Sequence, residues 1–233
     1  MINGKTIGAV ILAGGHGSRM HSSVQKQYMT LGGRPLITYA LEAFDRSAAD
    51  RLVLVVPQGE TEYVRSGILP LCRLTREPLV TEGGRERYHS VYQGLKALED
   101  CGYVLIHDGA RPLVTGAIIR RAIEGAVSYG ACVAGMPVKD TIKVAGEDGC
   151  ASRTLDRSRL WQIQTPQAFS YPLVRGAYDR LMEDEALQKG ITDDAMVVEN
   201  LAGYPVRLVE GSYENLKVTT PEDMILAEAL LRG

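Results

Sequence analysis

The sequence has no long hydrophobic run near its N-terminus. The apolar stretch there, residues 7–13, is far shorter than the ~20 residues that a membrane-spanning helix needs. Neither a basic region nor a small-residue cleavage site frames it, so we expect a cytoplasmic protein that does not enter a membrane. Cysteine is scarce as well. Cys72, Cys101, Cys132 and Cys150 form no Cys-x-x-Cys pair and have no nearby histidine, so we expect reduced thiols and no zinc site.

An excess of charge of one sign is also missing. The 26 Lys and Arg residues are balanced by 28 Asp and Glu residues, which leaves a formal net charge of −2 and argues against a nucleic-acid partner. Hydrophobic residues make up 45% of the chain and charged residues 23%, as in folded globular proteins. The length of 233 residues fits one domain, residues 1–233.

Short apolar runs alternate with segments of helical hydrophobic spacing. The runs are typical of strands buried on both faces of a parallel sheet. The alternation predicts an α/β fold with a doubly wound, mostly parallel, Rossmann-like sheet and a ligand site outside the carboxyl ends of its strands. The expected strands cover residues 6–13, 51–56, 103–107, 131–136 and 206–209, and the expected helices include residues 37–44, 91–98, 118–126, 173–182 and 221–231.

The alternation breaks between residues 138 and 165. Residues 140–144 and 152–155 flank the turn-rich residues 146–149, a pattern that predicts a protruding β-hairpin arm within residues 138–165. A two-stranded hairpin is marginally stable alone, so we expect the arm to pack on a second copy of the chain in a homodimer.

Three glycines within four residues follow the first expected strand, in the loop of residues 13–20. With Arg19, they favour phosphate binding over a plain tight turn, because glycine lets backbone N–H groups approach a phosphate. Met20 stands where the dinucleotide fingerprint needs a small residue, which argues against NAD, and the loop lacks the Gly-Lys-Ser/Thr of a P-loop. Lys26 adds a second cation suited to phosphoryl chemistry, although a solvated surface lysine is the alternative.

Several motifs carry a family resemblance. Residues 12–20 (LAGGHGSRM) and 26–28 (KQY) look like the signature loop of sugar-phosphate nucleotidyltransferases. Seven later segments, in unbroken order to about residue 231, make the chain resemble the 2-C-methyl-D-erythritol 4-phosphate cytidylyltransferase family. They are residues 83–91, 107–112, 138–143, 156–161, 165–167, 192–193 and 216–219.

The resemblance implies transfer of CMP from CTP to a methylerythritol phosphate, a polyol phosphate, with release of pyrophosphate and a requirement for Mg²⁺. It implies that Arg19 and Lys26 stabilise charge around the α-phosphate, and that Arg157 and Lys217 hold the acceptor's phosphate. The implied nucleotide-binding residues are Ala13, Gly14, Gly15, Gly17, Gly84, Arg87, Ser90 and Gly109. The implied acceptor-binding residues are Asp108, Arg111, Asp140, Thr141, Arg157, Thr165, Thr192 and Lys217.

Some of these residues also allow a structural interpretation. We expect Asp108, at the end of a strand, to bind Mg²⁺, but it is also suited to form a turn or cap a helix. Arg111 is equally suited to clamp a phosphate or to tie down its loop. Thr192 and Asp193 precede an apolar segment, so they contact the acceptor or cap a helix. His107 lies within an apolar strand and is predicted to be a buried core histidine.

Two departures from the family pattern and two other functions stay open. The family usually has alanine where this chain has Gly109, and we expect the change to leave room for the ligand; some relatives have an acidic residue in place of Arg85.

Cytidylyltransferases that act on ribitol 5-phosphate share the glycine loop and both cations, so acceptor identity depends on few residues. A non-catalytic nucleotide sensor is the other alternative, but it would not need the transition-state cations. If the arm crosses to a second subunit, the neighbouring active sites are shared.

Overall fold

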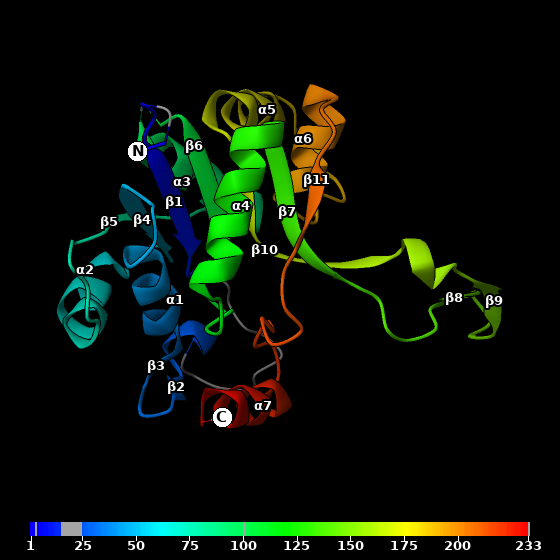
Figure 1. Ribbon diagram of the computed structural model, residues 1–233, viewed down its shortest axis with the longest axis horizontal. Helices are drawn as coiled ribbons and strands as arrows, with labels where there is room; N and C mark the ends of the chain where they lie inside the picture. The colour runs from blue at the N-terminus through cyan, green and yellow to red at the C-terminus, as the bar shows by residue number, and fades with distance from the viewer. Residues whose placement is uncertain (3, 15–24, 100, 233) are drawn as a thin grey trace.

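The computed structural model describes residues 1–2, 4–14, 25–99 and 101–232, and a seven-stranded sheet forms its centre (Figure 1). Every neighbouring pair of strands is parallel except those of β10, which is antiparallel to both of its neighbours. The predicted doubly wound, mostly parallel α/β fold with a hairpin arm is confirmed. In spatial order the strands are β11 (Arg207–Glu210), β7 (Ala131–Pro137), β10 (Trp161–Ser170), β6 (Tyr103–Asp108), β1 (Ile7–Leu12), β4 (Arg51–Val56) and β5 (Leu79–Glu82).

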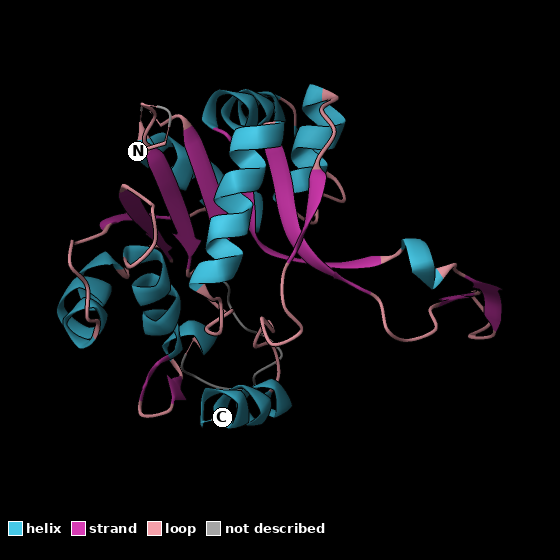
Figure 2. Cartoon of the chain, viewed as in Figure 1, coloured by secondary structure: helices cyan, strands magenta, loops and turns pink. Residues whose placement is uncertain are grey.

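Helices cover both faces of the sheet (Figure 2). Helices α1 (Leu36–Asp45) and α4 (Gly116–Tyr129) pack on one face, and α3 (Arg87–Leu98), α5 (Tyr171–Glu183) and α6 (Asp194–Ala202) pack on the other. Strand β1 shows the cause, because its side chains alternate between the faces: Ile11 joins the first core and Val10 the second. A strand with two buried faces must be apolar throughout, as the sequence pattern indicates.

The remaining elements lie around this centre. Helix α7 (Pro221–Arg232) packs against a small hairpin, β2 (Thr30–Leu31) and β3 (Arg34–Pro35), through Leu31, Leu36, Val218 and Ala227. None of the helices in the described part of the chain is both long and apolar enough to span a membrane. The short helices are η2 (Lys26–Tyr28), α2 (Thr61–Tyr63), η3 (Val64–Ile68), η4 (Leu69–Leu71), η5 (Arg157–Arg159) and η6 (Glu185–Gln188).

The arm leaves the sheet between β7 and β10 and extends away from it (Figure 1). Its hairpin consists of β8 (Lys143–Ala145) and β9 (Ala151–Thr154), which pair antiparallel where the sequence predicts a turn-linked pair. Residues 161–165 belong to β10, and the pairing of Trp161 with Pro137 continues the sheet toward the arm.

Strand β10 itself is absent from the sequence-based prediction. It carries Gln162, Gln164 and Gln167, together with a cis proline at Pro166, and its register against β7 shifts between Ile163 and Gln167. The period-two alternation of residues 161–164 spans only four residues, and Thr165 and Pro166 interrupt it. Among the described strands of the seven-stranded sheet, the antiparallel one therefore lies in a segment whose hydrophobic pattern is short and broken.

Candidate functional site

Two adjoining pockets open at the carboxyl ends of β1 and β6, beside the loop that follows β5. Strands β4 and β5 lie on one side of β1, and the next strand in the sequence, β6, lies on the other side. A ligand site in a doubly wound sheet is expected at the carboxyl ends of the strands where the strand order reverses in this way. The first pocket has a volume of about 300 Å³ and is lined by Leu12, Ala13, Gly14, Gln27, Arg85, Glu86, Arg87, Ser90, Asp108, Ala110 and Lys217. The second has a volume of about 290 Å³ and is lined by Arg87, Asp108, Arg111, Ile163, Gln164, Thr165, Gln167, Thr192, Asp193 and Lys217.

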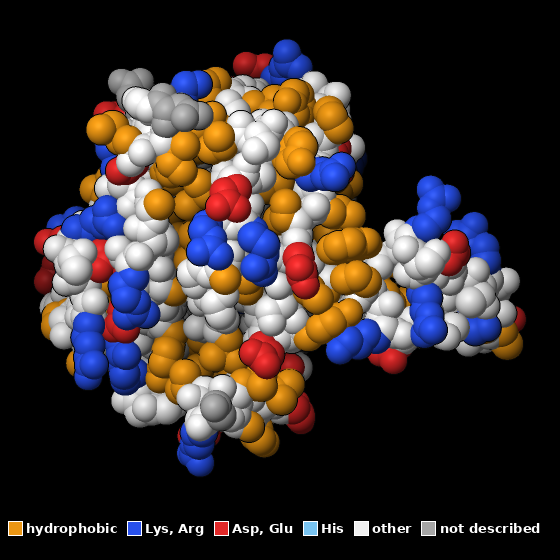
Figure 3. Space-filling view, in the orientation of Figure 1, with side chains coloured by type: hydrophobic (Ala, Val, Ile, Leu, Met, Phe, Trp, Pro, Cys, Tyr) orange, Lys and Arg blue, Asp and Glu red, His pale blue; other side chains and the backbone are white. Residues whose placement is uncertain are grey.

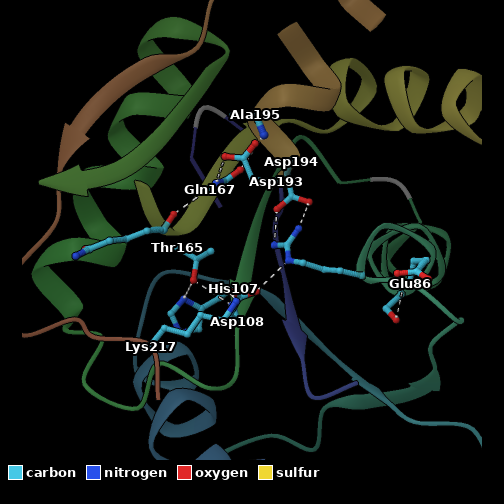
Figure 4. A network of polar contacts seen from close by, with 12 residues as sticks. Glu86, His107, Asp108, Thr165, Gln167, Asp193, Asp194, Ala195 and Lys217 are labelled. Carbon is cyan, nitrogen blue, oxygen red and sulfur yellow. Dashed lines mark hydrogen bonds and ion pairs between the residues drawn. The ribbon is translucent and has the colours of Figure 1, made fainter. Parts of the chain in front are cut away.

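Arg87, Asp108 and Lys217 line both pockets. Asp108 Oδ1 accepts a hydrogen bond from Arg87 Nε at 3.1 Å, and its Oδ2 accepts one from Lys217 Nζ at 2.7 Å (Figure 4). Burial alone would raise the pKa of Asp108, but the charges of Arg87, Lys217 and Arg111 outweigh it and hold the pKa of this carboxyl well below its usual range. Asp108 is therefore an anion held between two cations at the boundary between the pockets.

Three hydrogen bonds fix the segment that carries Lys217, two to the loop after β6 and one to β10. The backbone N–H of Val218 donates to the carbonyl of Ala110 at 2.8 Å, and Arg111 Nη1 donates to the carbonyl of Asn215 at 2.7 Å. The side-chain amide of the fully buried Asn215 donates to the carbonyl of Thr165 at 2.9 Å. Residues far apart in the sequence thus place the Lys217 ammonium beside the Asp108 carboxylate.

His107 is buried behind this site, as predicted, with none of its surface exposed. His107 Nε2 lies 3.2 Å from the carbonyl of Arg111, which can only accept, so Nε2 carries the proton and donates. Nδ1 of the neutral ring then accepts from the Thr165 hydroxyl at 3.0 Å, and the oxygen of that hydroxyl accepts from the Asp108 N–H at 3.0 Å. Burial lowers the pKa of His107 to about 4. The neutral imidazole therefore fixes the loop of Asp108 and Arg111 through these hydrogen bonds.

The loop after β5 closes the first pocket. Ser90 is buried on α3, and its hydroxyl accepts a hydrogen bond from the Gly84 N–H at 3.2 Å. A Cβ at Gly83 would lie 2.5 Å from Ser90 Oγ, so only glycine allows this approach. A Cβ at Gly14 would lie 3.4 Å from the same oxygen, so the loops after β1 and β5 meet at Ser90. The first turn of α3, capped by Glu86, presents backbone N–H groups and a positive dipole end at the pocket.

The structure gathers many of the residues predicted from the sequence. Ala13, Gly14, Arg87, Ser90, Asp108 and Lys217 line the first pocket, and Arg111, Thr165 and Thr192 line the second. Gly84 lies beside the first pocket through its contact with Ser90. The side chain of Asp193 accepts from the Met196 N–H at 2.9 Å and caps α6, so the capping interpretation is confirmed at that residue.

Other predicted residues lie elsewhere. Gly15, Gly17 and Arg19 fall outside the described residues, and Lys26 is described only by its backbone in η2. On the arm, Asp140, Thr141 and Arg157 are exposed, line neither pocket, and Arg157 Nη1 donates to the carbonyl of Lys139 at 2.6 Å. The chain therefore does not bring its own arm residues to its own pockets.

Gly109, which the family resemblance assigns to the nucleotide site, lies where the ends of β1 and β6 meet. A Cβ at this position would lie 2.2 Å from Ile37 Cδ1 and 2.8 Å from the carbonyl oxygen of Leu12. The space that glycine leaves is thus filled by the protein itself. The Gly109 N–H also donates to the Leu12 carbonyl at 2.8 Å and joins the ends of β6 and β1.

Sequence reasoning missed three polar residues of this region. Gln27 is buried and lines the first pocket; its amide donates to the Ala13 carbonyl, while its Oε1 has no hydrogen-bond partner among the described residues. Asp194, fully buried at the start of α6, pairs with Arg87, and Gln167 on β10 bonds to Asp193. Gln27 and Gln167 had a local signal, their places in the KQY motif and in the motif of residues 165–167; the contacts of Asp194 and Gln167 join distant segments.

The described residues do not form a metal site by themselves. No group of three or more His, Cys, Asp or Glu side chains that could hold a metal ion is found among them. Asp108 gives one carboxylate, and each of its oxygens already accepts from a cation. A divalent cation bound here would need most of its ligands from substrate oxygens or water, which is common for Mg²⁺ at phosphate sites.

The comparisons with known proteins agree with this geometry. The family model for 2-C-methyl-D-erythritol 4-phosphate cytidylyltransferase matches residues 7–233. A protein of that name from Lachnospira eligens is 49% identical over 228 residues, 97% of this chain and 99% of the relative, and one from Lachnoclostridium phytofermentans is 46% identical over 224 residues, 96% and 95% of the two chains.

Solved structures with the same fold span nearly the whole chain. The crystal structure of 4-diphosphocytidyl-2C-methyl-D-erythritol synthase from Anaerococcus prevotii has a TM-score of 0.83 at 30% identity and covers 99% of this chain and 100% of that one. The 2-C-methyl-D-erythritol 4-phosphate cytidylyltransferase from Thermus thermophilus has a TM-score of 0.78 at 32% identity and covers 96% and 98%.

Proposed function

The chain belongs to the 2-C-methyl-D-erythritol 4-phosphate cytidylyltransferase family, and from that premise we propose that it transfers CMP from CTP to 2-C-methyl-D-erythritol 4-phosphate, a step of isoprenoid biosynthesis. The observation that carries the proposal is the Arg87–Asp108–Lys217 set, which stands between two adjoining pockets at the carboxyl ends of the strands. Two pockets that share one charged boundary suit a reaction that joins two substrates.

In this reaction an oxygen of the acceptor's phosphate attacks the α-phosphorus of CTP, and the bond from that phosphorus to the pyrophosphate oxygen breaks. Two phosphate anions must approach each other, so the protein mainly has to position them and neutralise charge. Lys217, held beside Asp108, provides a cation where the pockets meet, and Arg111 lines the acceptor side. Asp108 remains ionised and can accept hydrogen bonds from the hydroxyl groups of the acceptor.

The nucleotide binds in the first pocket. Ala13, Gly14, Gly84 and Ser90 supply close backbone approaches and a hydroxyl, and the N-terminus of α3 favours an anion. Arg19 and Lys26 then act on the α-phosphate, with Gly15 and Gly17 in the same loop. Thr165 and Thr192 contact the acceptor in the second pocket. These assignments extend the family's pattern to the residues that match it.

The reaction depends on a divalent cation, Mg²⁺, which arrives bound to the phosphates of CTP. Asp108, at the boundary of the two pockets, is the carboxylate that would lie nearest such a cation, and phosphate oxygens and water would supply the other ligands. When bound, Mg²⁺ would neutralise charge on the triphosphate and so favour the departure of pyrophosphate.

We further propose that residues 1–233 form one nucleotidyltransferase domain that acts as a cytoplasmic homodimer, with the arm insertion of residues 138–165 completing the neighbouring site. Asp140, Thr141 and Arg157 are exposed on the arm and so are available to a second chain. At the arm's root, Ile163, Leu208 and Tyr213 are 39%, 41% and 41% exposed, and hydrophobic side chains gather on this side of the molecule (Figure 3). A dimer would bury both the hairpin and this surface.

The experiment is a pyrophosphate-release assay with CTP and Mg²⁺, in which 2-C-methyl-D-erythritol 4-phosphate and ribitol 5-phosphate are offered in parallel. We expect turnover with the first acceptor and at least about 10²-fold lower kcat/KM with the second, because buried groups matched to one polyol are left unpaired by another. Turnover with ribitol phosphate alone would refute the acceptor assignment. Binding of CTP with no turnover on either acceptor would instead indicate a nucleotide sensor.

A further inference from the structure

Asp194 is a charged side chain that the proposed chemistry leaves without a task. It is the first residue of α6 and is completely buried. Its two oxygens accept from Arg87 Nη1 and Nη2, each at 2.8 Å, in a bidentate pair. The hydroxyl of Tyr178, on α5 and equally buried, donates to Oδ1 at 2.5 Å. These three hydrogen bonds therefore fix the Asp194 carboxylate, which is buried behind the pockets.

Stability alone is a weak reason for such a pair. Taking two charges out of water costs several kcal/mol per ion, and well-packed hydrophobic residues often replace a buried ion pair without loss. The pair around Asp194 is instead distinguished by its position: Arg87 lines both pockets, with its side chain 29% exposed, whereas Asp194 lies fully behind them. A carboxylate in this place fixes the orientation of the guanidinium that faces the substrates.

The planar guanidinium of Arg87 determines which of its nitrogens is left to donate to Asp108. Because both terminal nitrogens of Arg87 bind Asp194, only its Nε is directed to Asp108 Oδ1 (Figure 4). Asp108 Oδ2 is then left to Lys217. Without Asp194, the terminal nitrogens of Arg87 would be free to turn toward Asp108 or toward a bound phosphate, and the boundary between the pockets would lose its geometry.

The same pair also joins the two substrate segments. Arg87 begins α3, directly after the loop of Gly84 that closes the first pocket. Asp194 follows Thr192 and Asp193, which line the second pocket. Asp193 is fixed in turn, because its Oδ2 accepts from Gln167 Nε2 at 2.9 Å. A shift of either segment must therefore move the Arg87–Asp194 pair or break it.

We propose that Asp194 is a positioning residue which, through Arg87, couples binding of the nucleotide to binding of the acceptor. The proposal rests on the proposed function for the identity of the two ligands. Ordering one pocket fixes Arg87 and with it the segment that lines the other, so each substrate binds more tightly when its neighbour is present. Such coupling between sites is reciprocal and typically amounts to about 5-fold or more in affinity.

The test compares Asp194→Asn with a matched control, Asp45→Asn. Asp45 is also a buried carboxylate, with its side chain fully covered, and pairs with Arg76 at 3.1 Å. Asp45 is the last residue of α1, and its partner Arg76 also donates to the carbonyl of Asp50, directly before β4. The pair therefore lies at the amino end of β4, whereas the pockets lie at the carboxyl ends of the strands. Both substitutions break a buried ion pair, but only one of these pairs touches the site.

Isothermal titration gives the Kd of the magnesium complex of α,β-methylene-CTP, with and without saturating 2-C-methyl-D-erythritol 4-phosphate. In the wild type we expect the acceptor to lower this Kd by about 5-fold or more. Asp194→Asn should reduce the ratio to about one and raise KM for both substrates by roughly 10-fold, more than it lowers kcat. Asp45→Asn should lower the Tm and leave the ratio and both KM values at their wild-type levels.

If Asp194→Asn does not fold, Arg87→Lys provides the second variant. Lysine keeps the charge but cannot bind both carboxylates with a fixed fork, so it should abolish the coupling too. The proposal would be overturned if either variant kept the same ratio of Kd values as the wild type and showed only a lower Tm. It would also be overturned if the acceptor did not change the Kd of the wild type at all. Failure of the proposed function is seen separately, because the wild-type enzyme would then turn over no 2-C-methyl-D-erythritol 4-phosphate at all.

Discussion

Acidification should destabilise this protein through one buried side chain, His107. Burial lowers its pKa to about 4, and Thr165 and the carbonyl of Arg111 engage its two nitrogens as a neutral ring. In the unfolded chain a histidine has its ordinary pKa of about 6.5. Between these values the unfolded state binds a proton that the folded state does not, so stability falls as the pH falls.

The two pKa values set the size of the effect. Their difference of about 2.5 units, at about 1.4 kcal/mol per unit, gives a total of roughly 3 kcal/mol. The full stabilisation by the neutral ring is present above about pH 6.5, since neither state then carries the proton. About 2 kcal/mol is lost by pH 5, and the rest is lost as the pH passes through the folded-state pKa near 4.

Urea unfolding between pH 8 and pH 5 measures this loss in the wild type and in His107→Gln. Glutamine keeps a donor and an acceptor but takes up no proton, so the wild type should lose about 2 kcal/mol more than the variant over this range. The range stops at pH 5 because carboxylates whose pKa is lowered, such as Asp108, lose their stabilisation below it. Parallel pH dependences for the two proteins would refute the neutral buried imidazole.

Three further predictions concern the site, the backbone and the arm. Lys217→Gln should lower kcat/KM by about 10²-fold or more in steady-state assays, because it removes the cation between the pockets; a loss of less than about threefold would assign that task elsewhere. Gly109→Ala should lower the free energy of unfolding by about 1–3 kcal/mol, since its Cβ meets the Leu12 carbonyl; Gly176→Ala, a helical site with open space, should raise it by about 0.5–1 kcal/mol. Mixing inactive Arg157→Ala and Lys26→Ala chains should restore about a quarter of the activity, and no recovery would mean that each subunit builds its own site.

The parts of the fold that the sequence predicts are those governed by local pattern. Strand β6 was expected over residues 103–107 with Asp108 at the ligand edge, because an apolar run and a terminal carboxylate are both visible in the sequence. Strand β10 was not, since two of its glutamines are buried and find their hydrogen-bond partners far along the chain: Gln164 bonds to Ser212, and Gln167 to Asp193. A strand whose buried polar residues are satisfied by distant partners gives only a short, interrupted hydrophobic period.

The residues of the site also fall into those with a local sequence signal and those whose role depends on distant partners. Motif residues such as Arg87, Ser90 and Lys217 were predicted and do line the pockets. The role of Arg87 was not, because its partner Asp194 lies 107 residues away along the chain. The Thr-Asp-Asp pattern indicates a helix start there, and pairing between distant charges has no local signature.

The central claim, cytidylyl transfer between two phosphates, is tested most directly by the ³¹P NMR spectrum of a reaction with CTP, Mg²⁺ and 2-C-methyl-D-erythritol 4-phosphate. The account predicts that the acceptor's phosphate monoester signal disappears and is replaced by two coupled diphosphate resonances, with free pyrophosphate in equal amount. An unchanged phosphate monoester signal, whether CTP stays intact or is hydrolysed to CMP and pyrophosphate, would contradict it.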